Sequence, residues 1–460
     1  MNPPSTPIDA EARPAMMLRY GLLGLPLSFA ALPLVVQWPA HASAQWGLPL
    51  SVVGGLLLGI RLLDAAVDPW IGRRADGWFE QAPSGPIAAL AVACALLWGG
   101  FVWLFLWTPP STAVTAGASA TERGLLLACA AVALLVTTLG YSGAQILHQA
   151  WGARLGGGAG QQARWVGARE GFALFVVLCA SILPSVGGWL VTTAVLAALL
   201  MGSVLLLSSG PTPVAASSHA APATDFAKAK LVSGDRHRPW RTPAFAWLLG
   251  VHLLNGLAAA IPASLVLFFI RDRVQAPAAF EPVFLAAYFI AAAAAVPLWI
   301  RSVGRIGLTR TWGAGMVLSL ATFCSAVATQ AGDTGFFLAI CVASGTALGA
   351  NLVAPPALLA ETLRREGLQG QAEGQWFGWW TLVTKLQAAA AAGLALPALQ
   401  WLGYAPGSRD PAAGQALAWV YAALPCAIQA LATALLWARR HEWEPSPPSP
   451  GTSSSGSPTP

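Results

Sequence analysis

Apolar stretches of roughly 20 residues recur along the whole chain, and mostly short polar segments separate them. A helix of about 20 residues crosses a hydrocarbon core of about 30 Å. Because the bilayer offers the backbone no water, each stretch must satisfy its own polar groups, as a helix does. The pattern predicts an all-α membrane protein with twelve transmembrane helices. They are expected at about 16–38, 49–71, 86–108, 123–149, 165–186, 188–208, 243–270, 280–300, 311–330, 335–360, 374–402 and 414–438.

Composition excludes a soluble globule. The 460 residues are 56% hydrophobic and 10% charged, against about 25% charged in a soluble domain. The six cysteines all fall in apolar runs without the spacing of metal ligands, and no nucleophile–base spacing stands out. We therefore expect no enzyme, cofactor or metal site. The first apolar run is too long for a signal peptide and is expected to be the first span.

Two polar segments divide the chain. Residues 209–242 are rich in Ser, Pro, Lys and Arg and predict a cytoplasmic linker between an N-terminal six-helix bundle (1–208) and a C-terminal one (243–440). The tail over 441–460 contains EPSPPSPGTSSSGSPTP, a Pro/Ser-rich composition typical of disorder.

Most of the 25 basic residues fall on one side of the predicted spans. Cytoplasmic loops are enriched in Lys and Arg. We therefore expect a multi-pass protein of the inner (plasma) membrane with both termini in the cytoplasm, and no nucleic-acid surface. The inner groups are Arg73 with Arg74, Lys228 to Arg241, Arg301 to Arg310 and Arg439 with Arg440; the outer ones are Arg123, Arg271, Arg273 and Arg409.

A faint repeat links the two halves. DPWIGRRADG closes the second span and VPLWIRSVGRIG closes the eighth, each with Pro, Trp, Ile and then arginines. With six spans on either side of a linker, this indicates two parallel halves related by an axis along the membrane normal.

Three charges interrupt the second span. Arg61, Asp64 and Asp68 lie at i, i+3 and i+7, hence on one helix face. An ionised side chain at bilayer depth costs roughly 2.5–3.5 kcal/mol on insertion scales, so this face points into the bundle or a cavity. One interpretation is a packing salt bridge between Arg61 and Asp64. The other is a site for a cation or proton, because two carboxylates beside one arginine leave surplus negative charge.

Other spans carry polar groups as well. Lys385 in the eleventh span has no acid within a turn, so its partner is expected to be a carboxylate of the second span. The tryptophans beside it are either interface anchors or a face that stacks on a sugar ring. A hydrogen-bonded core role is the simpler interpretation of His252, and His148 stays ambiguous. The further polar groups are Tyr141, Gln145, Arg169, Glu170, Asn255, Thr381, Trp376, Trp379 and Trp380.

The segment RLLDAAVDPWIGRRAD resembles the second-helix signature R-x-x-D-A-x-x-D-P-x-x-G-x-x-x-D of the glycoside–pentoside–hexuronide:cation symporters. This melibiose-carrier-like family belongs to the major facilitator superfamily. Further similar positions are Tyr20-Gly21, Tyr141 and the run from Glu373-Gly374 through Phe377, Thr381 and Lys385 to Gly403-Tyr404. The resemblance implies a major facilitator fold of two six-helix bundles.

The resemblance also implies site residues. Asp64 and Asp68 would couple the cation, and the substrate would bind at Arg61, Tyr141, Gln145, Arg169, Trp380, Thr381 and Lys385. Two positions depart from the family: its helix-1 acid falls at Leu27 and Ser28, and its helix-4 acid at Gln145. These departures disfavour a galactoside as substrate and sodium as the coupling ion.

We therefore expect a monomeric secondary symporter that moves a small polar solute, such as a sugar or glycoside, with H+ rather than Na+. An alternative is a carrier of the same fold for an amphiphile such as a lysolipid. A membrane sensor or enzyme without transport is the third, least supported interpretation.

Overall fold

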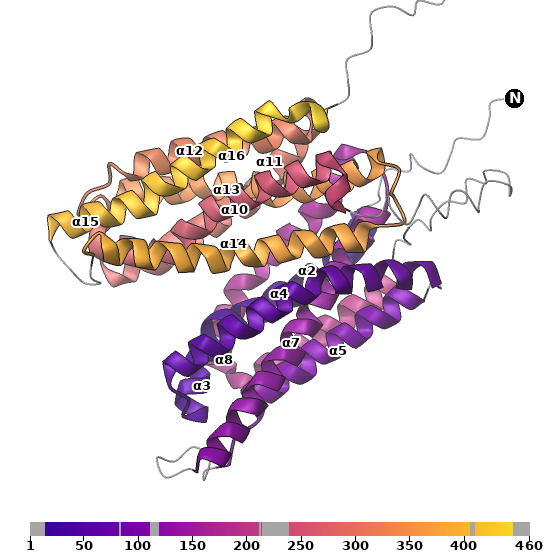
Figure 1. Cartoon of the computed structure of the whole chain (residues 1–460), viewed down its shortest axis with the longest axis horizontal. Coiled ribbons are helices and arrows are strands. Elements are labelled where there is room, and N and C mark those ends of the chain that lie inside the picture. Colours follow the sequence, from indigo (N-terminus) through magenta and orange to yellow (C-terminus); the bar gives the residue numbers. More distant parts are fainter. Residues whose placement is uncertain are drawn as a thin grey trace, which may run out of the picture.

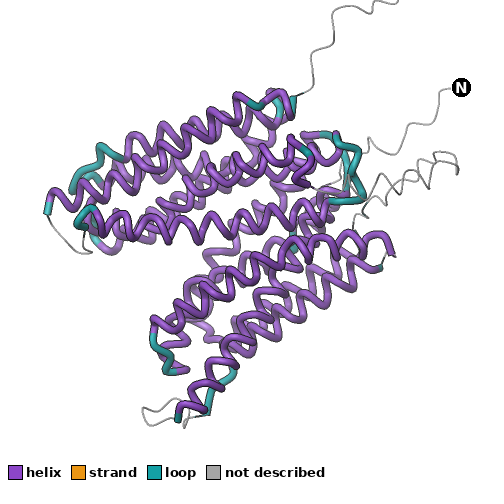
Figure 2. The backbone as a smooth tube through the Cα atoms, in the orientation of Figure 1, coloured by secondary structure: helices purple, strands orange, loops and turns teal. Residues whose placement is uncertain are grey.

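The computed structural model describes residues 14–81, 84–110, 119–210, 213, 239–404 and 410–444. Within these ranges all regular secondary structure is helical (Figure 2). The chain is thus an all-α protein, as the recurrent apolar stretches predict.

The N-terminal bundle takes in the described residues up to Ser208. Its first span is broken into short pieces, and its last two spans form one long helix with a kink at Gly188, whose φ is 71°. Its elements are α1 (Pro14–Gly21), α2 (Gly24–Leu32), η2 (Pro33–Gln37), α3 (Trp38–Trp46), α4 (Leu50–Gln81), α5 (Gly85–Leu106), α7 (Ala120–Arg154) and α8 (Ala159–Ser208).

The C-terminal bundle begins after a short turn of 3-10 helix and contains the remaining spans. Short π-helical segments, η4 and η6, continue or join its seventh and twelfth spans. Its elements are η3 (Pro239–Arg241), α10 (Pro243–Phe268), η4 (Phe269–Val274), η5 (Ala278–Phe280), α11 (Glu281–Ile306), α12 (Leu308–Ala326), α13 (Thr334–Arg365), α14 (Glu373–Trp401), α15 (Pro411–Ala418), η6 (Trp419–Ala423), α16 (Leu424–Ala438) and η7 (Arg440–Glu442).

Each of the twelve expected spans falls on helix. Within the described residues, nine helical segments are long and apolar enough to cross a membrane by length and composition. The other three expected spans lie on α4, on the first half of α8 and on α12. All three carry charges: α4 holds Arg61, Asp64 and Asp68, α8 holds Arg169 and Glu170, and α12 holds Arg310.

The two bundles lie beside each other (Figure 1), and their two most extensive contacts each join one helix of either bundle. α4 packs against α14, and α8 packs against α11. These are the second and eleventh spans and the fifth and eighth, so the two contacts have equivalent places in the two halves. Pro69 of α4 and Pro297 of α11, the prolines of the faint repeat, both lie inside their helices.

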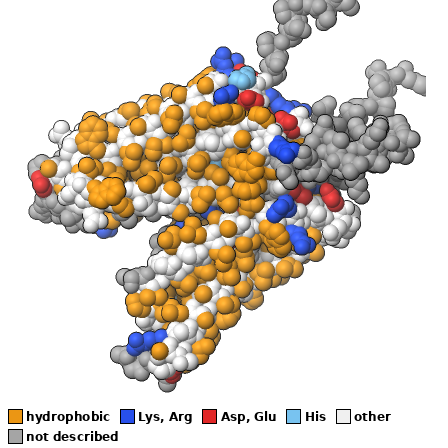
Figure 3. All heavy atoms as spheres, viewed as in Figure 1, with side chains coloured by type: hydrophobic (Ala, Val, Ile, Leu, Met, Phe, Trp, Pro, Cys, Tyr) orange, Lys and Arg blue, Asp and Glu red, His pale blue; other side chains and the backbone are white. Residues whose placement is uncertain are grey.

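The bundles meet at one end of the molecule and diverge toward the other (Figures 1 and 3). We call the meeting end the linker end, because Pro239, at the end of the expected linker, lines a pocket there with Arg73 of α4 and Gln375 of α14. Arg19 donates a hydrogen bond to the Ser209 carbonyl oxygen, and Trp443 Nε1 donates to the Ala244 carbonyl oxygen at 3.1 Å. Most of the linker itself lies outside the described residues.

Two parts of the chain differ from the prediction. The first span continues past residue 38 through α3, which ends where Gly47 takes a φ of 62°. The C-terminal bundle extends beyond its predicted end at residue 440, because Trp443 is buried against α10 and residues 441–444 pack on that bundle. The Trp443 indole buries its ring and satisfies its N–H, and it thereby holds this segment on the bundle. Residues 445–460 lie outside the described part.

Candidate functional site

Lys385 joins the two bundles through buried carboxylates. Its Nζ lies 2.6 Å from Asp64 Oδ2 and 2.7 Å from Asp68 Oδ2. It also donates to Ser142 Oγ at 2.7 Å, and Ser142 in turn donates to Asp64 Oδ1 at 2.8 Å. The prediction that the second span supplies the partner of Lys385 is therefore confirmed.

Helix geometry explains this meeting. Asp64 and Asp68 are one turn apart on α4 and face the same side. Lys385 lies twelve residues into α14, roughly 18 Å along its axis. The helices can approach because Gly378 faces the backbone of α4: a Cβ there would lie 2.6 Å from the Asp68 carbonyl oxygen. The cluster of Asp64, Asp68, Ser142 and Lys385, here called the bridge cluster, is thus built by both bundles.

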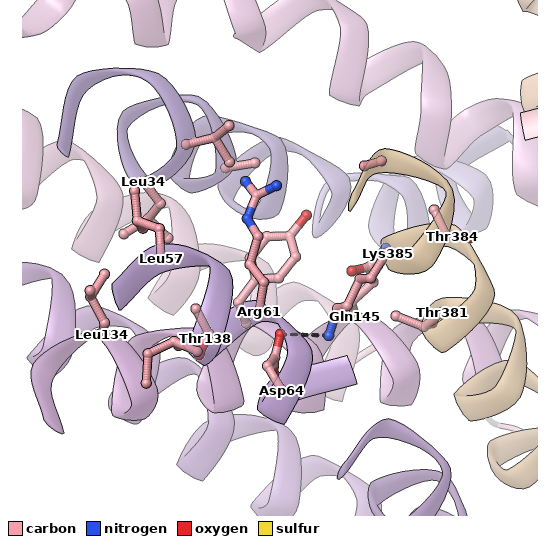
Figure 4. A pocket seen from close by; sticks show the side chains of 15 residues that line it. Leu34, Leu57, Arg61, Asp64, Leu134, Thr138, Gln145, Thr381, Thr384 and Lys385 are labelled. Carbon is pink, nitrogen blue, oxygen red and sulfur yellow. Dashed lines mark hydrogen bonds and ion pairs between the residues drawn. The ribbon is translucent and has the colours of Figure 1, made fainter. Parts of the chain in front are cut away.

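A cavity of about 280 Å³ lies against the bridge cluster. This is near the lower end of the roughly 300–1,000 Å³ common for small-molecule sites. Figure 4 shows Asp64 and Lys385 joined across it, with Thr381 and Thr384 on the α14 side. The wall comprises Ala31, Leu34, Val35, Leu57, Ile60, Arg61, Asp64, Leu134, Thr138, Tyr141, Gln145, Thr381, Thr384, Lys385 and Ala388.

Arg61 does not form the salt bridge considered for it. Asp64 is engaged by Lys385 and Ser142, and Arg61 makes no ion pair or hydrogen bond with any described residue. Figure 4 shows its guanidinium pointing away from the Asp64 carboxylate on the wall of the cavity. The physical reason is that the Lys385 ammonium already contacts both carboxylates of α4.

The structure brings most of the expected site residues together. Arg61, Asp64, Tyr141, Gln145, Thr381 and Lys385 line the cavity, and Asp68 lies fully buried behind Lys385. Trp380 and Arg169 are not part of the lining. Trp380 stacks on the His252 ring with centroids 3.6 Å apart, and Arg169 pairs with Glu170 at 2.6 Å. The expected sugar-stacking face of Trp380 is thus covered by His252.

The two ambiguous histidines have internal partners. His252 Nε2 lies 3.0 Å from Thr384 Oγ1, and His148 Nε2 lies 2.9 Å from the Tyr20 carbonyl oxygen. Both therefore fit the simpler interpretation of hydrogen-bonded core residues.

Sequence reasoning missed three polar residues of this region: Ser142, Thr138 and Thr384. Ser142 and Thr138 lie on α7, and Thr384 directly precedes Lys385 on α14. Thr138, Tyr141 and Gln145 fall at i, i+3 and i+7, the spacing of one helix face. That stripe is a signal for Thr138. Ser142 and Thr384 carry no comparable signal, because single hydroxyl residues are common in apolar helices.

A second charged cluster joins the bundles at the linker end. Arg154 Nη2 lies 2.8 Å from Asp76 Oδ1, and Arg154 Nε lies 3.1 Å from Glu373 Oε2. Asp76 also accepts from the backbone N–H groups of Gly374 and Gln375 at 2.7 and 2.9 Å. These amides open α14, where a helix favours a negative charge. We call Asp76, Arg154 and Glu373 the linker-end cluster.

Among the described residues, no three His, Cys, Asp or Glu side chains lie close enough together to hold a metal ion. The bridge cluster has two carboxylates, and their shared cation is the ammonium of the chain itself.

Comparison with solved structures gives the fold. A bacterial homologue of the iron transporter ferroportin, in its outward-facing state, is similar with a TM-score of 0.66 and 15% identity over 92% of this chain and 98% of that one. The E. coli fucose:proton symporter matches with a TM-score of 0.58 and 12% identity over 93% and 98%. A proton:xylose symporter matches with a TM-score of 0.60 and 14% identity over 92% and 94%.

The sequence itself matches a family model described as MFS/sugar transport protein over residues 19–439. No curated protein matches the chain in sequence. The matched range takes in both bundles, the bridge cluster and the linker-end cluster. The chain therefore belongs to the MFS/sugar transport protein family and is a multi-pass membrane transporter with the major facilitator fold.

Proposed function

We propose that this transporter is a proton-coupled secondary symporter that carries a small solute by alternating access, with the solute bound between the two bundles. The observation that carries the proposal is Lys385. It comes from the C-terminal bundle and is held by two buried carboxylates of the N-terminal bundle, on the wall of the cavity.

The bridge cluster gives a physical route to coupling. Asp64, Asp68 and Lys385 together hold one surplus negative charge when all three are ionised. A proton on either carboxylate removes that surplus and weakens the attraction that ties α14 to α4, because the protonated acid no longer forms an ion pair. Protonation and the movement of the bundles would thus be linked at one place.

A proton fits the cluster better than a sodium ion does. Hard metal cations need several oxygen ligands around them. Here the Lys385 ammonium lies where such an ion would sit, within 2.6–2.9 Å of Asp64, Asp68 and Ser142 oxygens. Gln145 also supplies a neutral amide where the resembling symporters carry an acid.

A sugar or glycoside is supported by the polar part of the cavity. The Thr138, Thr381, Thr384 and Tyr141 hydroxyls and the Gln145 amide line it, and groups of this kind exchange hydrogen bonds with a polyol. Two structural neighbours are proton symporters of fucose and xylose. We further propose that the protein is a monomer in the inner membrane. We propose that both termini lie in the cytoplasm, because the arginines gather toward the linker end.

One observation favours the alternative of an amphiphilic solute. Leu34, Leu57, Ile60 and Leu134 belong to one hydrophobic cluster, and all four line the cavity. A polyol alone would leave this wall without a matching surface. An amphiphile such as a lysolipid would cover it and place a polar head near Arg61.

Proton movement in reconstituted vesicles tests the proposed function. The protein would be reconstituted into vesicles loaded with a pH-sensitive dye. Sugars, glycosides and lysolipids would then be added to the outside, with and without sodium at constant pH. We expect at least one solute to carry protons inward without sodium, and a pH gradient to drive its accumulation.

Asp68→Asn should exchange that solute between compartments but fail to concentrate it. Glu122→Gln, at a capping position far from the bridge cluster, is the matched control and should behave like the wild type. Full gradient-driven accumulation by Asp68→Asn would refute the coupling role, and sodium-stimulated uptake at constant pH would refute proton coupling.

A further inference from the structure

Arg61 brings to the cavity a positive charge that forms no ion pair with a described residue. The other cation of the wall, Lys385, is matched by both carboxylates of α4. Arg61 has no ion pair or hydrogen bond among the described residues, and its side chain lines the cavity. A guanidinium in a site of low dielectric constant gains most from an anionic partner, because charge-assisted hydrogen bonds are about twice as strong as neutral ones.

The surroundings of Arg61 are divided by polarity. On one side lie Leu57 of the same helix, Leu34 of η2 and Leu134 of α7 (Figure 4). On the other side lie Thr381 and Thr384 of α14. A ligand that satisfies this cavity therefore needs an anionic group beside an apolar body of a few carbon atoms.

The ionisable groups around the site balance one another. α4 contributes Arg61, Asp64 and Asp68, and α14 contributes Lys385. Arg169 and Glu170 of α8 pair with each other and cancel. The other titratable groups on the elements packed around the site are Tyr141 and His148 of α7, His252 of α10 and His41 of α3, which packs on Phe105. No charged residue occurs in α2, η2 or α5.

The balance has a consequence for loading. With Asp64 and Asp68 ionised, the two acids and the two cations Arg61 and Lys385 sum to zero. An anionic solute alone would bring the buried site to −1, and a proton alone would bring it to +1. Both together return it to zero. Since a net charge at bilayer depth is costly, the neutral loaded state is the one that can cross with the moving bundles.

From these observations we propose that the solute is an amphiphilic monoanion, held by Arg61 at its charged group and by the Leu34–Leu57–Leu134 wall at its apolar body, and carried together with one proton in an electroneutral step. This inference rests on the proposed symport function and names its substrate class. Carboxylate, sulfonate and phosphodiester heads are monoanions and share the chemistry that Arg61 recognises.

Binding tests the recognition part without any transport. The full chain in lipid nanodiscs would be titrated with hexane-1-sulfonate, hexanoate and hexyl methyl phosphate, all monoanions, with methanesulfonate as the tail-less control and 1-hexanol as the uncharged one. We expect at least one C6 anion to bind roughly tenfold or more tightly than both controls. Arg61→Gln should remove that advantage, roughly tenfold or more, while Arg61→Lys retains part of it. Arg305→Gln, on the exposed end of α11, is the matched control.

Equal binding of the C6 anions and 1-hexanol, no binding of any of the three anions, or unchanged binding by Arg61→Gln would each overturn the assignment. A general loss of folding is separated from a specific one by the Arg61→Lys variant and by the thermal unfolding midpoint of each protein.

Uptake tests the charge balance. Vesicles containing the protein should accumulate the bound anion when the outside is acidic, and a potassium diffusion potential set by valinomycin should not change the rate. If the anion binds through Arg61 but a pH gradient drives no uptake, the symport function fails and the recognition stands. If a neutral sugar carries protons and no anion binds, the symport function stands and this inference fails. Uptake that follows the membrane potential would overturn the electroneutral step.

Discussion

At the scale of single residues, the candidate site depends on one lysine that forms ion pairs with two acids. Lys385 is held by Asp64 and Asp68, which lie 321 and 317 positions away in the sequence. The sequence could indicate that Lys385 needed a distant acid, because no acid lay within a turn of it. It could not indicate that Arg61 would remain without one, since Arg61 and Asp64 share a helix face. Only the position of α14 decides which cation the carboxylates hold.

The bridge cluster predicts a stability pattern for neutral substitutions. Lys385→Met leaves two buried carboxylates without their cation, and removing one partner of a buried pair typically costs about 3–5 kcal/mol. Adding Asp64→Asn and Asp68→Asn removes the uncompensated charges. We expect the triple variant to unfold at a higher temperature than Lys385→Met alone, measured by thermal melting in detergent. A triple variant no more stable than the single one would contradict the pairing.

At the scale of helices, the crossing of α4 and α14 depends on glycine. A Cβ at Gly72 would lie 2.1 Å from the Gly374 carbonyl oxygen, and a Cβ at Gly374 would lie 2.3 Å from the Gly72 carbonyl oxygen. Sequence alone predicts that both are helical but not that their backbones touch. The helices themselves were predictable because each needs about 20 apolar residues. Their irregularities, such as the π-helical turn at Pro33–Gln37, were not, since proline is common in membrane helices.

Gly374→Ala should push the two bundles apart at the linker end. The substitution leaves no room for its methyl group unless α4 moves. Spin labels at exposed Arg74 and Gln371 would report a longer distance between the bundles than in the wild type. Gly393→Ala is the matched control on the same helix, because a Cβ there meets nothing within 4 Å. An unchanged label distance in Gly374→Ala would show that the crossing tolerates the methyl group.

Loss of a charge from the linker-end cluster should also separate the two bundles at that end. Asp76→Asn removes the anion that pairs with Arg154 and accepts from the first amides of α14. Losing a charged hydrogen-bond partner costs about 1–3 kcal/mol. We expect a lower thermal midpoint and a larger share of long label distances at the linker end. The exposed Glu80→Gln on the same helix serves as the control. Equal distance distributions in Asp76→Asn and the wild type would contradict a role in holding that end closed.

At the scale of the whole molecule, two bundles converge at the linker end and diverge at the other, with the cavity between them (Figures 1 and 3). The division into halves was predictable from the polar segment between the sixth and seventh spans and from the faint repeat. The arrangement of the halves was not, because it depends on contacts between residues several hundred positions apart. The burial of Trp443 was not predictable either, because it depends on a contact with the distant helix α10.

The orientation of the molecule can be measured with fusions. We expect a fluorescent protein after residue 460 to fold and fluoresce, because the linker end carries most of the arginines and should face the cytoplasm. Alkaline phosphatase at that position should be inactive. A phosphatase fusion at residue 276, between the seventh and eighth spans, should be active and serves as the reciprocal control. Active phosphatase after residue 460 would reverse the predicted orientation.

The bridge between the bundles also has a consequence for biosynthesis. Lys385 follows Asp68 by 317 residues, and at about 5–20 residues per second the ribosome needs roughly 15–60 s to supply it. During that time α4 lies in or near the bilayer with two acids and without the lysine that pairs with both. A fragment that ends at residue 210 should therefore be removed quickly by membrane proteases. The same fragment with Asp64→Asn and Asp68→Asn should accumulate to higher levels on an immunoblot of membranes, so the carboxylates proposed to couple transport would also be what keeps an unfinished chain from persisting.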